Sequence, residues 1–454
     1  MNYFGDIGLG GIEFVLLPIY AAIIILLANN TVAKHAQDFR YKKYFLKGLY
    51  YKLFAAIFYG LIYVYYYKGG DTINYFLGTT PLFELAFSHP GRLIEFIFLE
   101  NKYPLEATWG ALSNGVGFII EGSASVTVLK VSSIINILGL NSFFLTTLLF
   151  GSISYLAHWK VFKLFSGLYP ELTNVMAFAF LMIPSVLFWG SGISKDTIVL
   201  SCIFFCFSSF IELTILKKRI GFNLFIFGLT AYIISLTRGY VIFALIPSLL
   251  VLVAINFKDA FRSAFLRYLL TPVFIGLSLL IAVFVLPKIG GALESYNIDT
   301  ISKKAEGFKS WHQTVNETQG GSGYTLGEFD YTLAGMLKVA PKALMITLYG
   351  PFIWEVKNVV MLLSAIESIA LLFFTLRFIY RNGAGNSFSI LISNKFTVFS
   401  LLFVLIIGVS CGMTSFNYGA LVRYKIPILP FYVASLAILN LTTLNQQKTT
   451  QVAA

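Results

Sequence analysis

Charged residues in apolar surroundings are the first candidates for chemistry in this sequence. Asp71 follows Gly69 and Gly70 in "YYKGGDTINYF", directly after an apolar stretch. Two consecutive glycines let the backbone turn sharply. An aspartate at such a turn either caps the next helix or presents a carboxylate at the membrane surface as a general base or a metal ligand. Both interpretations stay open, and Asp71 is our candidate catalytic residue.

Cations form a second set, each near the end of an apolar stretch. Lys195 and Asp196 follow a glycine-containing turn in "FWGSGISKDTI", where a helix start offers free N–H groups and the positive end of its dipole. A turn needs glycine but not lysine, so the pattern favours anion binding over a plain hairpin. Arg238 ("LTRGY"), Arg423 and Lys425 ("LVRYKIP") have similar positions. We predict that Lys195, Arg238, Arg423 and Lys425 bind a substrate phosphate; snorkelling to lipid headgroups is the alternative for the last two.

Weaker candidates for the same site are Asp196, Glu355, Glu367, Asn417 and His312. Glu367 falls inside an apolar stretch, where a carboxyl has to be protonated, paired or in a polar cavity. His312 has the chemistry of a base, although a lone histidine in a polar loop is usually only solvent-exposed. No metal ligands are assigned.

Composition indicates which elements must position these residues. Of the 454 residues, 57% are hydrophobic and 12% charged, and the mean hydropathy is +0.78. A soluble domain has about 25% charged residues, so the composition excludes a soluble enzyme, a disordered protein and a nucleic-acid-binding module. The net charge of +12 fits a membrane protein, because Lys and Arg collect beside membrane spans. Three cysteines exclude a disulfide framework, and we interpret Cys202 and Cys206 as packing residues.

The expected fold is all-α, a polytopic helical bundle of about 11 transmembrane helices in one integral membrane domain, residues 1–454. A span needs about 20 mostly apolar residues. The qualifying stretches are 11–29, 48–67, 142–159, 173–190, 197–215, 222–237, 240–257, 268–287, 358–379, 396–415 and 420–440. The short basic connections share one side if these helices alternate, which predicts an outer N-terminus and a cytoplasmic C-terminus.

Two long connections, 68–141 and 288–357, then lie on the outer side. Loops above about 15 residues usually serve a function. Both hold apolar segments that are too short or too amphipathic to span, at 81–99, 125–140 and 331–350. We expect these segments to form interfacial helices that cover the outer face of the bundle.

In this topology the candidate cations and Asp71 share the outer face of the membrane. Such a set fits a polyprenyl phosphate or pyrophosphate that carries a sugar. The cations would hold the leaving phosphate, and the carboxylate would take the proton of the acceptor hydroxyl. The carrier brings its own activation, so no nucleotide motif is required. No organic cofactor is expected, and a role for Mg²⁺ or Mn²⁺ is left open.

Five motifs in the chain are distinctive: "GGDTINYF" (69–76), "PSVLFWGSGISKDTI" (184–198), "RGY" (238–240), "GPFIWEVKNVVMLLSAIES" (350–368) and "NYGALVRYKIPILPF" (417–431). On these motifs the chain resembles the Bacteroidetes family of polytopic membrane proteins related to C-type (GT-C) glycosyltransferases and O-antigen polymerases, and the resemblance covers nearly the whole chain from residue 60. It implies the bacterial inner membrane as the location and an acidic catalytic residue in the first outer loop, the role that Asp71 matches. Asp71 lacks the second acid that is common in C-type enzymes.

The expected function is transfer of a sugar from a polyprenyl-phosphate-linked donor to a glycan or protein acceptor, with membrane lipid as a further partner and no nucleic acid. Polymerase or ligase chemistry and single-sugar transfer fit equally well. A transporter or flippase of lipid-linked glycan is one alternative, although polar residues gather at the outer edge rather than at mid-membrane. A non-catalytic membrane subunit of an envelope machine is the other.

Overall fold

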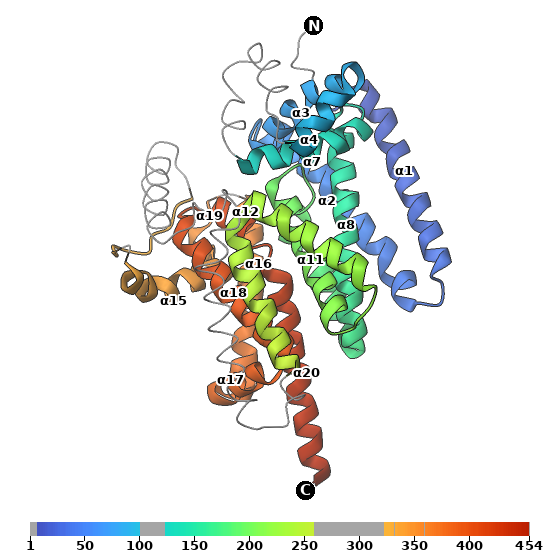
Figure 1. Ribbon diagram of the computed structural model, residues 1–454. Coiled ribbons are helices and arrows are strands. Elements are labelled where there is room, and N and C mark those ends of the chain that lie inside the picture. The colour runs from blue at the N-terminus through green and yellow to red at the C-terminus, as the bar shows by residue number, and fades with distance from the viewer. Residues whose placement is uncertain (1–6, 100–122, 258–321, 331, 358, 454) are drawn as a thin grey trace. The chain divides into compact units, whose positions relative to one another are not determined.

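A computed structural model describes residues 7–99, 123–257, 322–330, 332–357 and 359–453 (Figure 1). Throughout these ranges the regular elements are helices, and the one extended contact recorded is an isolated bridge between Gly323 and Asn417. The all-α prediction is therefore confirmed. The predicted span 268–287 and the candidate His312 lie outside the described residues.

The chain divides into two compact units, which we describe separately. Unit 1 comprises Met1–Tyr169, Phe180–Ser208 and Ile226–Arg238. Unit 2 comprises Pro170–Ala179, Ser209–Phe225 and Gly239–Ala454.

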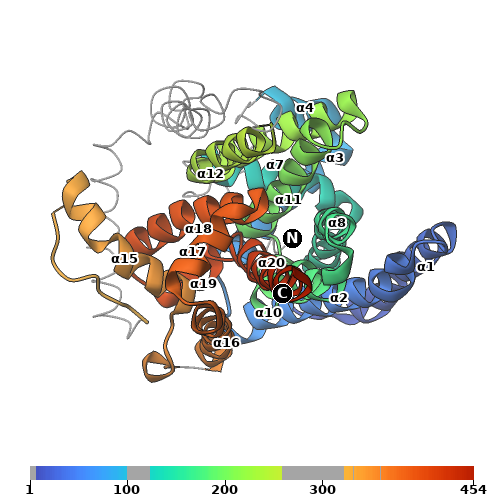
Figure 2. The same ribbon diagram turned by 90° about the horizontal axis from the view of Figure 1, so that it is seen from below.

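Unit 1 is built around the pair of helices α2 and α8, which pack along each other, with α1 and α10 at their sides (Figure 2). Helix α3 packs on α7 and α4. The elements are α1 (Gly11–Lys34), the π-helical η1 (Tyr41–Phe45), α2 (Leu46–Leu61), the π-helical η2 (Ile62–Tyr66), α3 (Asp71–Ser88), α4 (Pro90–Leu99), α7 (Ser123–Leu138), α8 (Phe143–Leu168) and α10 (Pro184–Trp189).

Unit 2 is built around α18, which packs on α15 and α20, while α16 contacts α15 and α20. Its elements are η3 (Pro170–Leu172), α15 (Leu333–Tyr349), η8 (Ile353–Glu355), α16 (Val359–Asn382), α17 (Ala384–Ser393), α18 (Lys395–Thr414), α19 (Tyr418–Tyr424) and α20 (Leu429–Ala453). Helices α9 (Thr173–Leu181), α11 (Lys195–Thr214) and α12 (Ile220–Phe257) have residues in both units.

Six described helices have the length and hydropathy to cross a membrane, and the number rises to eight if each of two bent pairs is one span. A multi-pass membrane character is thus supported, whereas the count of about 11 is not confirmed. The six are Gly11–Lys34, Tyr41–Tyr66, Lys195–Thr214, Ile220–Phe257, Met361–Asn382 and Lys395–Thr414; the pairs are Ala124–Leu138 with Phe143–Leu168 and Tyr418–Tyr424 with Leu429–Asn445.

Prolines explain two differences from the predicted spans. The stretch 173–190 is not one helix, because α9 ends at Leu181 and α10 begins at Pro184. The stretch 420–440 is bent by 62° between α19 and α20, where Pro427 lies. Proline lacks an N–H donor and disfavours a helical conformation in the preceding residue, so it interrupts both stretches.

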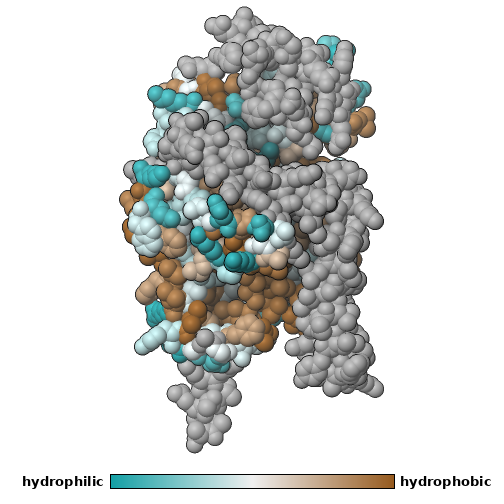
Figure 3. Space-filling model, turned by 90° about the vertical axis from the view of Figure 1, so that its left-hand side faces the viewer, coloured by the Kyte–Doolittle hydropathy of each residue, from teal (hydrophilic) through white to brown (hydrophobic). Residues whose placement is uncertain are grey.

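Exposed apolar surface accords with a lipid environment. Helix α1 is apolar on all sides, and only 6% of its most hydrophobic window is buried. In unit 2, α16 exposes Leu363, Phe373 and Phe374. Figure 3 shows one face of the molecule, on which hydrophobic side chains form a broad area with hydrophilic side chains above and below it.

Candidate functional site

Arg238 and Asp196, two of the predicted site residues, form an ion pair in unit 1. Arg238 interrupts α12 with non-helical backbone angles (φ −139°, ψ 74°). Its Nη2 donates to Oδ1 of Asp196 at 2.5 Å, and the two side chains are only 11% and 3% exposed. Asp196 lies in the first turn of α11, directly after Lys195. The structure therefore brings Lys195, Asp196 and Arg238 together at the start of this helix.

The turn before α11 is held by buried hydroxyls. Ser194 Oγ accepts from the Thr197 backbone N–H at 3.2 Å, which satisfies one of the free donors at the helix start. The Ser194 and Thr197 hydroxyls also bond to each other at 3.1 Å. Both residues are 1% exposed. The helix start that carries Lys195 is thus fixed in a buried setting.

Lys52, a buried lysine outside the predicted set of site residues, supports the same turn. Lys52 of α2 is fully buried, and its Nζ donates to the Gly190 carbonyl at 2.6 Å and lies 3.2 Å from His158 Nε2. His158 Nδ1 lies 2.8 Å from the Phe180 carbonyl. A carbonyl only accepts, so His158 carries its proton on Nδ1 and accepts from Lys52 through Nε2. The signal was present in the sequence, because both residues fall within predicted spans, where ionisable groups are rare.

Tyrosines connect this turn with the turn that carries Asp71. Tyr59 and Tyr63 have ring centroids 4.6 Å apart, on successive turns of the helix formed by α2 and η2. A Cβ at Gly192 would lie 1.9 Å from the Tyr59 ring, and one at Gly70 would lie 3.1 Å from the Tyr63 ring. Gly192 and Gly70, which belong to two predicted motifs of unit 1, therefore pack against two neighbouring tyrosine rings of one helix. We call Tyr59 and Tyr63 the tyrosine ladder.

Asp71 begins α3 rather than capping it. Gly70 is the residue before the helix, with φ at 106°, a conformation that favours glycine. Asp71 is exposed in the first turn, where the positive end of the helix dipole stabilises a carboxylate. This position leaves the carboxylate accessible to a substrate.

In unit 2, Lys425 is buried between α19 and α20 and serves as an internal link. Its Nζ donates to the Gly350 carbonyl at 2.8 Å and to Ser368 Oγ at 2.9 Å, while Ser368 Oγ donates to the same carbonyl. Lys425 is 1% exposed, so a phosphate reaches it only if these contacts open. The predicted residue Glu367 lies near enough to act electrostatically on Lys425. Arg423 is half-buried and lies two residues earlier, in α19.

Asn417 and Glu355 stabilise local turns of unit 2. Asn417 Oδ1 caps α19 by accepting from the Gly419 N–H at 2.8 Å and the Ala420 N–H at 3.3 Å. Glu355 accepts from the Phe352 N–H at 2.8 Å and lies near the Tyr418 ring hydroxyl. Both predicted residues therefore have structural contacts within unit 2.

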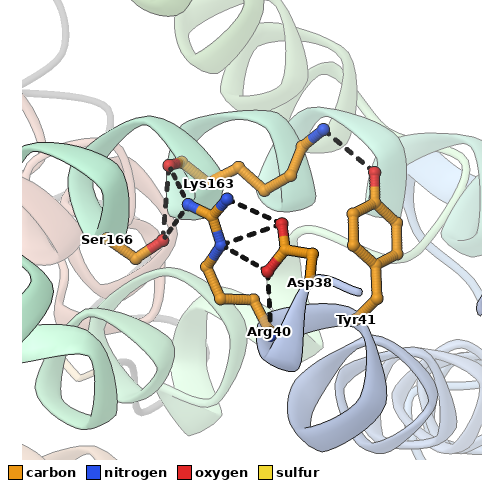
Figure 4. Close-up of polar contacts among 5 residues, drawn as sticks. All are labelled: Asp38, Arg40, Tyr41, Lys163 and Ser166. Carbon is orange, nitrogen blue, oxygen red and sulfur yellow. Dashed lines mark hydrogen bonds and ion pairs between the residues drawn. The ribbon is translucent and has the colours of Figure 1, made fainter. Parts of the chain in front are cut away.

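A separate polar cluster lies in unit 1 at a connection predicted to be cytoplasmic (Figure 4). Arg40 donates two hydrogen bonds to the Asp38 carboxylate, from Nε to Oδ1 at 2.8 Å and from Nη2 to Oδ2 at 2.6 Å. Its Nη1 donates to Ser166 Oγ at 3.4 Å. Lys163 Nζ donates to the Tyr41 hydroxyl at 3.0 Å. The hydrogen bond from Arg40 lowers the pKa of Asp38. Arg40 and Lys163 belong to the short basic connections that predicted the orientation of the helices.

Five of the predicted site residues thus form two sets, one in each unit. Unit 1 gathers Lys195, Asp196 and Arg238, and unit 2 gathers Lys425 with Glu367 nearby. Across the part of the chain that the structure describes, there is no group of three or more His, Cys, Asp or Glu able to hold a metal ion. A role for a divalent cation stays a prediction.

Comparisons with protein-family models, with curated proteins and with solved structures find no match to this chain. The resemblance to C-type glycosyltransferases and O-antigen polymerases therefore stays a prediction from the sequence motifs.

Proposed function

We propose that the protein is a membrane glycosyltransferase or polysaccharide polymerase that uses a polyprenyl-phosphate-linked sugar donor at the outer face of the bacterial cytoplasmic membrane. The observation that carries the proposal is the contact of Arg238, at the break in α12, with the first turn of α11. A guanidinium, a lysine and a helix start meet there, and each favours a phosphate. The sequence motifs of the resembled family supply the reaction class.

In this proposal Lys195 and Arg238 hold the phosphate that leaves when the sugar is transferred. Asp196 is a positioning residue, because its carboxylate fixes the Arg238 guanidinium. Asp71 takes the proton from the acceptor hydroxyl and is suited to this by its exposure at the start of α3. Arg423 of unit 2 stays a separate prediction from the sequence and has no part in this phosphate site.

The test is complementation of a deletion strain, read out as the profile of surface polysaccharide and glycoprotein and as the pool of lipid-linked sugar. We expect Asp71→Asn and Arg238→Ala to lose the surface glycan and to accumulate the lipid-linked donor at normal protein levels. Two variants serve as matched controls and should complement the deletion. Glu84→Gln changes another exposed acid of α3, and Arg381→Ala changes an exposed arginine at the end of α16.

Two outcomes would count against the proposal. Full complementation by Asp71→Asn removes the catalytic assignment. An unchanged glycan profile in the deletion strain removes glycan transfer altogether and favours a non-catalytic membrane subunit.

Transport of a lipid-linked glycan is a second candidate, and the Lys52–His158 contact favours it. Ionisable side chains that are buried in a candidate span are typical of proton relays in transporters. In vesicles that contain a lipid-linked glycan, a transporter predicts that Lys52→Met stops its movement between leaflets. A transferase predicts that the wild-type protein consumes the donor instead of moving it.

A further inference from the structure

An apolar cavity of about 270 Å³, about half open to its surroundings, lies in unit 2. Four helices that contact one another, α16, α17, α18 and α20, form its walls. The apolar lining includes Phe378, Ile379, Phe388, Leu391, Val404 and Leu436. An apolar cavity of roughly 150 Å³ already stays free of water and takes up apolar molecules. The larger cavity here therefore suits a hydrocarbon ligand rather than water.

Most hydroxyl groups in the walls are satisfied by the protein itself. Thr375 Oγ1 donates to the Leu371 carbonyl at 2.8 Å and lies 2.7 Å from the Tyr432 hydroxyl. Ser387 Oγ donates to the Gly383 carbonyl at 2.7 Å. Because these hydroxyls already have partners within the protein, they offer little hydrogen bonding to a ligand, and the walls act as apolar surfaces.

Ser435 is a lining residue whose hydroxyl is buried without a partner. It is 7% exposed, and its Oγ has no hydrogen-bond partner among the described residues. Leaving a buried hydroxyl without a partner costs about 1–3 kcal/mol. The Oγ atom has almost no accessible surface as it stands, so the side chain has to rotate before its hydroxyl faces the cavity. A ligand with one oxygen next to a hydrocarbon chain would then remove this cost and fill the cavity.

The position of the cavity indicates the source of such a ligand. Helices α16 and α18 are candidate membrane spans, and α20 belongs to a bent pair that also qualifies. The lining residues of α16 and α18 come from the end at which α17 joins the two helices. The basic residues Arg377, Arg381 and Lys395 lie at that same end. Basic residues beside a span attract anionic lipid headgroups.

We infer that this cavity binds one acyl chain of an anionic phospholipid, with an oxygen of its ester group accepting from Ser435 Oγ. The inference rests on the walls, the unpartnered hydroxyl and the basic end of unit 2, and it is independent of the proposed function. The ligand is held without any covalent step.

The test uses the full-length protein in vesicles of phosphatidylethanolamine and phosphatidylglycerol, with a trace of phosphatidylglycerol that carries a diazirine in one acyl chain. After irradiation, mass spectrometry should find cross-links on the cavity-lining residues of α17 and α18, such as Phe388 and Val404. Ser435→Phe fills the cavity and should remove these cross-links. Ser410→Phe, on α18 outside the cavity lining, is the matched control and should keep them.

A milder variant guards against misfolding of the filled cavity. Ser435→Ala keeps the space and removes one hydrogen bond, so the apparent affinity for phosphatidylglycerol should fall about fivefold in a competition assay. The inference would be overturned if Ser435→Ala and the wild type had equal affinity for phosphatidylglycerol. It would also be overturned if the wild-type cross-links fell only on residues outside the cavity lining. Stronger labelling by a diazirine polyprenyl phosphate or by phosphatidylcholine would assign the cavity to an isoprenoid or to a neutral lipid instead.

Discussion

Arg238 reaches across 42 residues of sequence to place its Nη2 2.5 Å from Oδ1 of Asp196. The contact occurs at the interruption of α12, where Arg238 has non-helical backbone angles. Asp196 in turn lies at the positive end of the α11 dipole. The carboxylate therefore interacts with two positive groups, and it fixes the direction of the guanidinium beside Lys195.

Replacing the carboxylate tests this arrangement. Asp196→Asn keeps the shape of the side chain but leaves the Arg238 guanidinium, which is 11% exposed, without its ionic partner. Removal of one partner of a buried pair costs about 3–5 kcal/mol. We expect a lower Tm of the detergent-solubilised protein.

A double-mutant cycle separates this pair from other effects. Arg238→Met combined with Asp196→Asn should be less destabilised than the sum of the two single variants. Additive losses would mean that the two side chains do not depend on each other.

The close approach of Gly192 to the tyrosine ladder gives a second prediction. A Cβ at Gly192 would lie 1.9 Å from the Tyr59 ring, and Tyr59 is 1% exposed. Gly192→Ala must therefore shift a buried ring, and overpacking of this kind costs about 1–3 kcal/mol. Thermal unfolding in detergent should show the loss.

Gly221 supplies the matched control. A Cβ there meets nothing within 4 Å. Gly221 lies in the first turn of α12, so Gly221→Ala should be neutral or gain up to about 1 kcal/mol from helix propensity. Equal effects of the two alanine variants would contradict the packing argument.

Particular residues show what the sequence could and could not predict. Hydropathy identified the helical membrane character. The pattern "GSGISKD" predicted a helix that begins at Lys195 or Asp196, and α11 begins at Lys195. Stretch 173–190 was wrong as a single span because hydropathy averages over Pro184, whose effect on the backbone is local. The Asp196–Arg238 pair was not predicted, because residues distant in sequence meet only through tertiary packing.

Lys52 and Lys425 show that the role of a lysine in a membrane protein is hard to predict from its sequence position. Lys425 was selected as an outer-edge cation, yet its contacts in unit 2 are with a carbonyl and a serine. Lys52 was passed over inside a predicted span, yet it supports the turn at Gly190. The sequence position shows that a cation in an apolar stretch is unusual. Its hydrogen-bond partners in the structure show whether it stabilises the fold.

The internal contacts of Lys425 give a third prediction. Lys425→Met retains the length and apolar stem of the side chain, and the Gly350 carbonyl keeps its bond from Ser368. If Lys425 serves the fold, this variant should lose about 1–3 kcal/mol of stability and keep glycan transfer in proportion to its folded amount.

A phosphate ligand would behave in the opposite way. Lys425→Met would then abolish transfer with little change in Tm. Measuring Tm and complementation on the same set of variants, with Lys425→Arg included, distinguishes the two roles.

The Asp38–Arg40 pair gives a prediction of pH dependence. The hydrogen bond from Arg40 lowers the pKa of Asp38 in the folded state. A lowered folded-state pKa contributes stability above the ordinary Asp value of about 3.9, and this contribution is lost as the pH falls through the folded-state value. The two side chains are about a quarter exposed, and a bidentate pair at such a site is worth about 1 kcal/mol.

Asp38→Asn isolates that contribution, because an amide does not ionise in this range. At neutral pH the wild type should have the higher Tm, and the gap should shrink as the pH is lowered past about 4. Raising the salt concentration should narrow the neutral-pH gap as well, since exposed charges are screened. A Tm difference that stays constant through the acidic range would mean that the carboxylate acts through its shape alone. The electrostatic part of the Arg40 contact would then not help to hold the connection between α1 and η1 against α8.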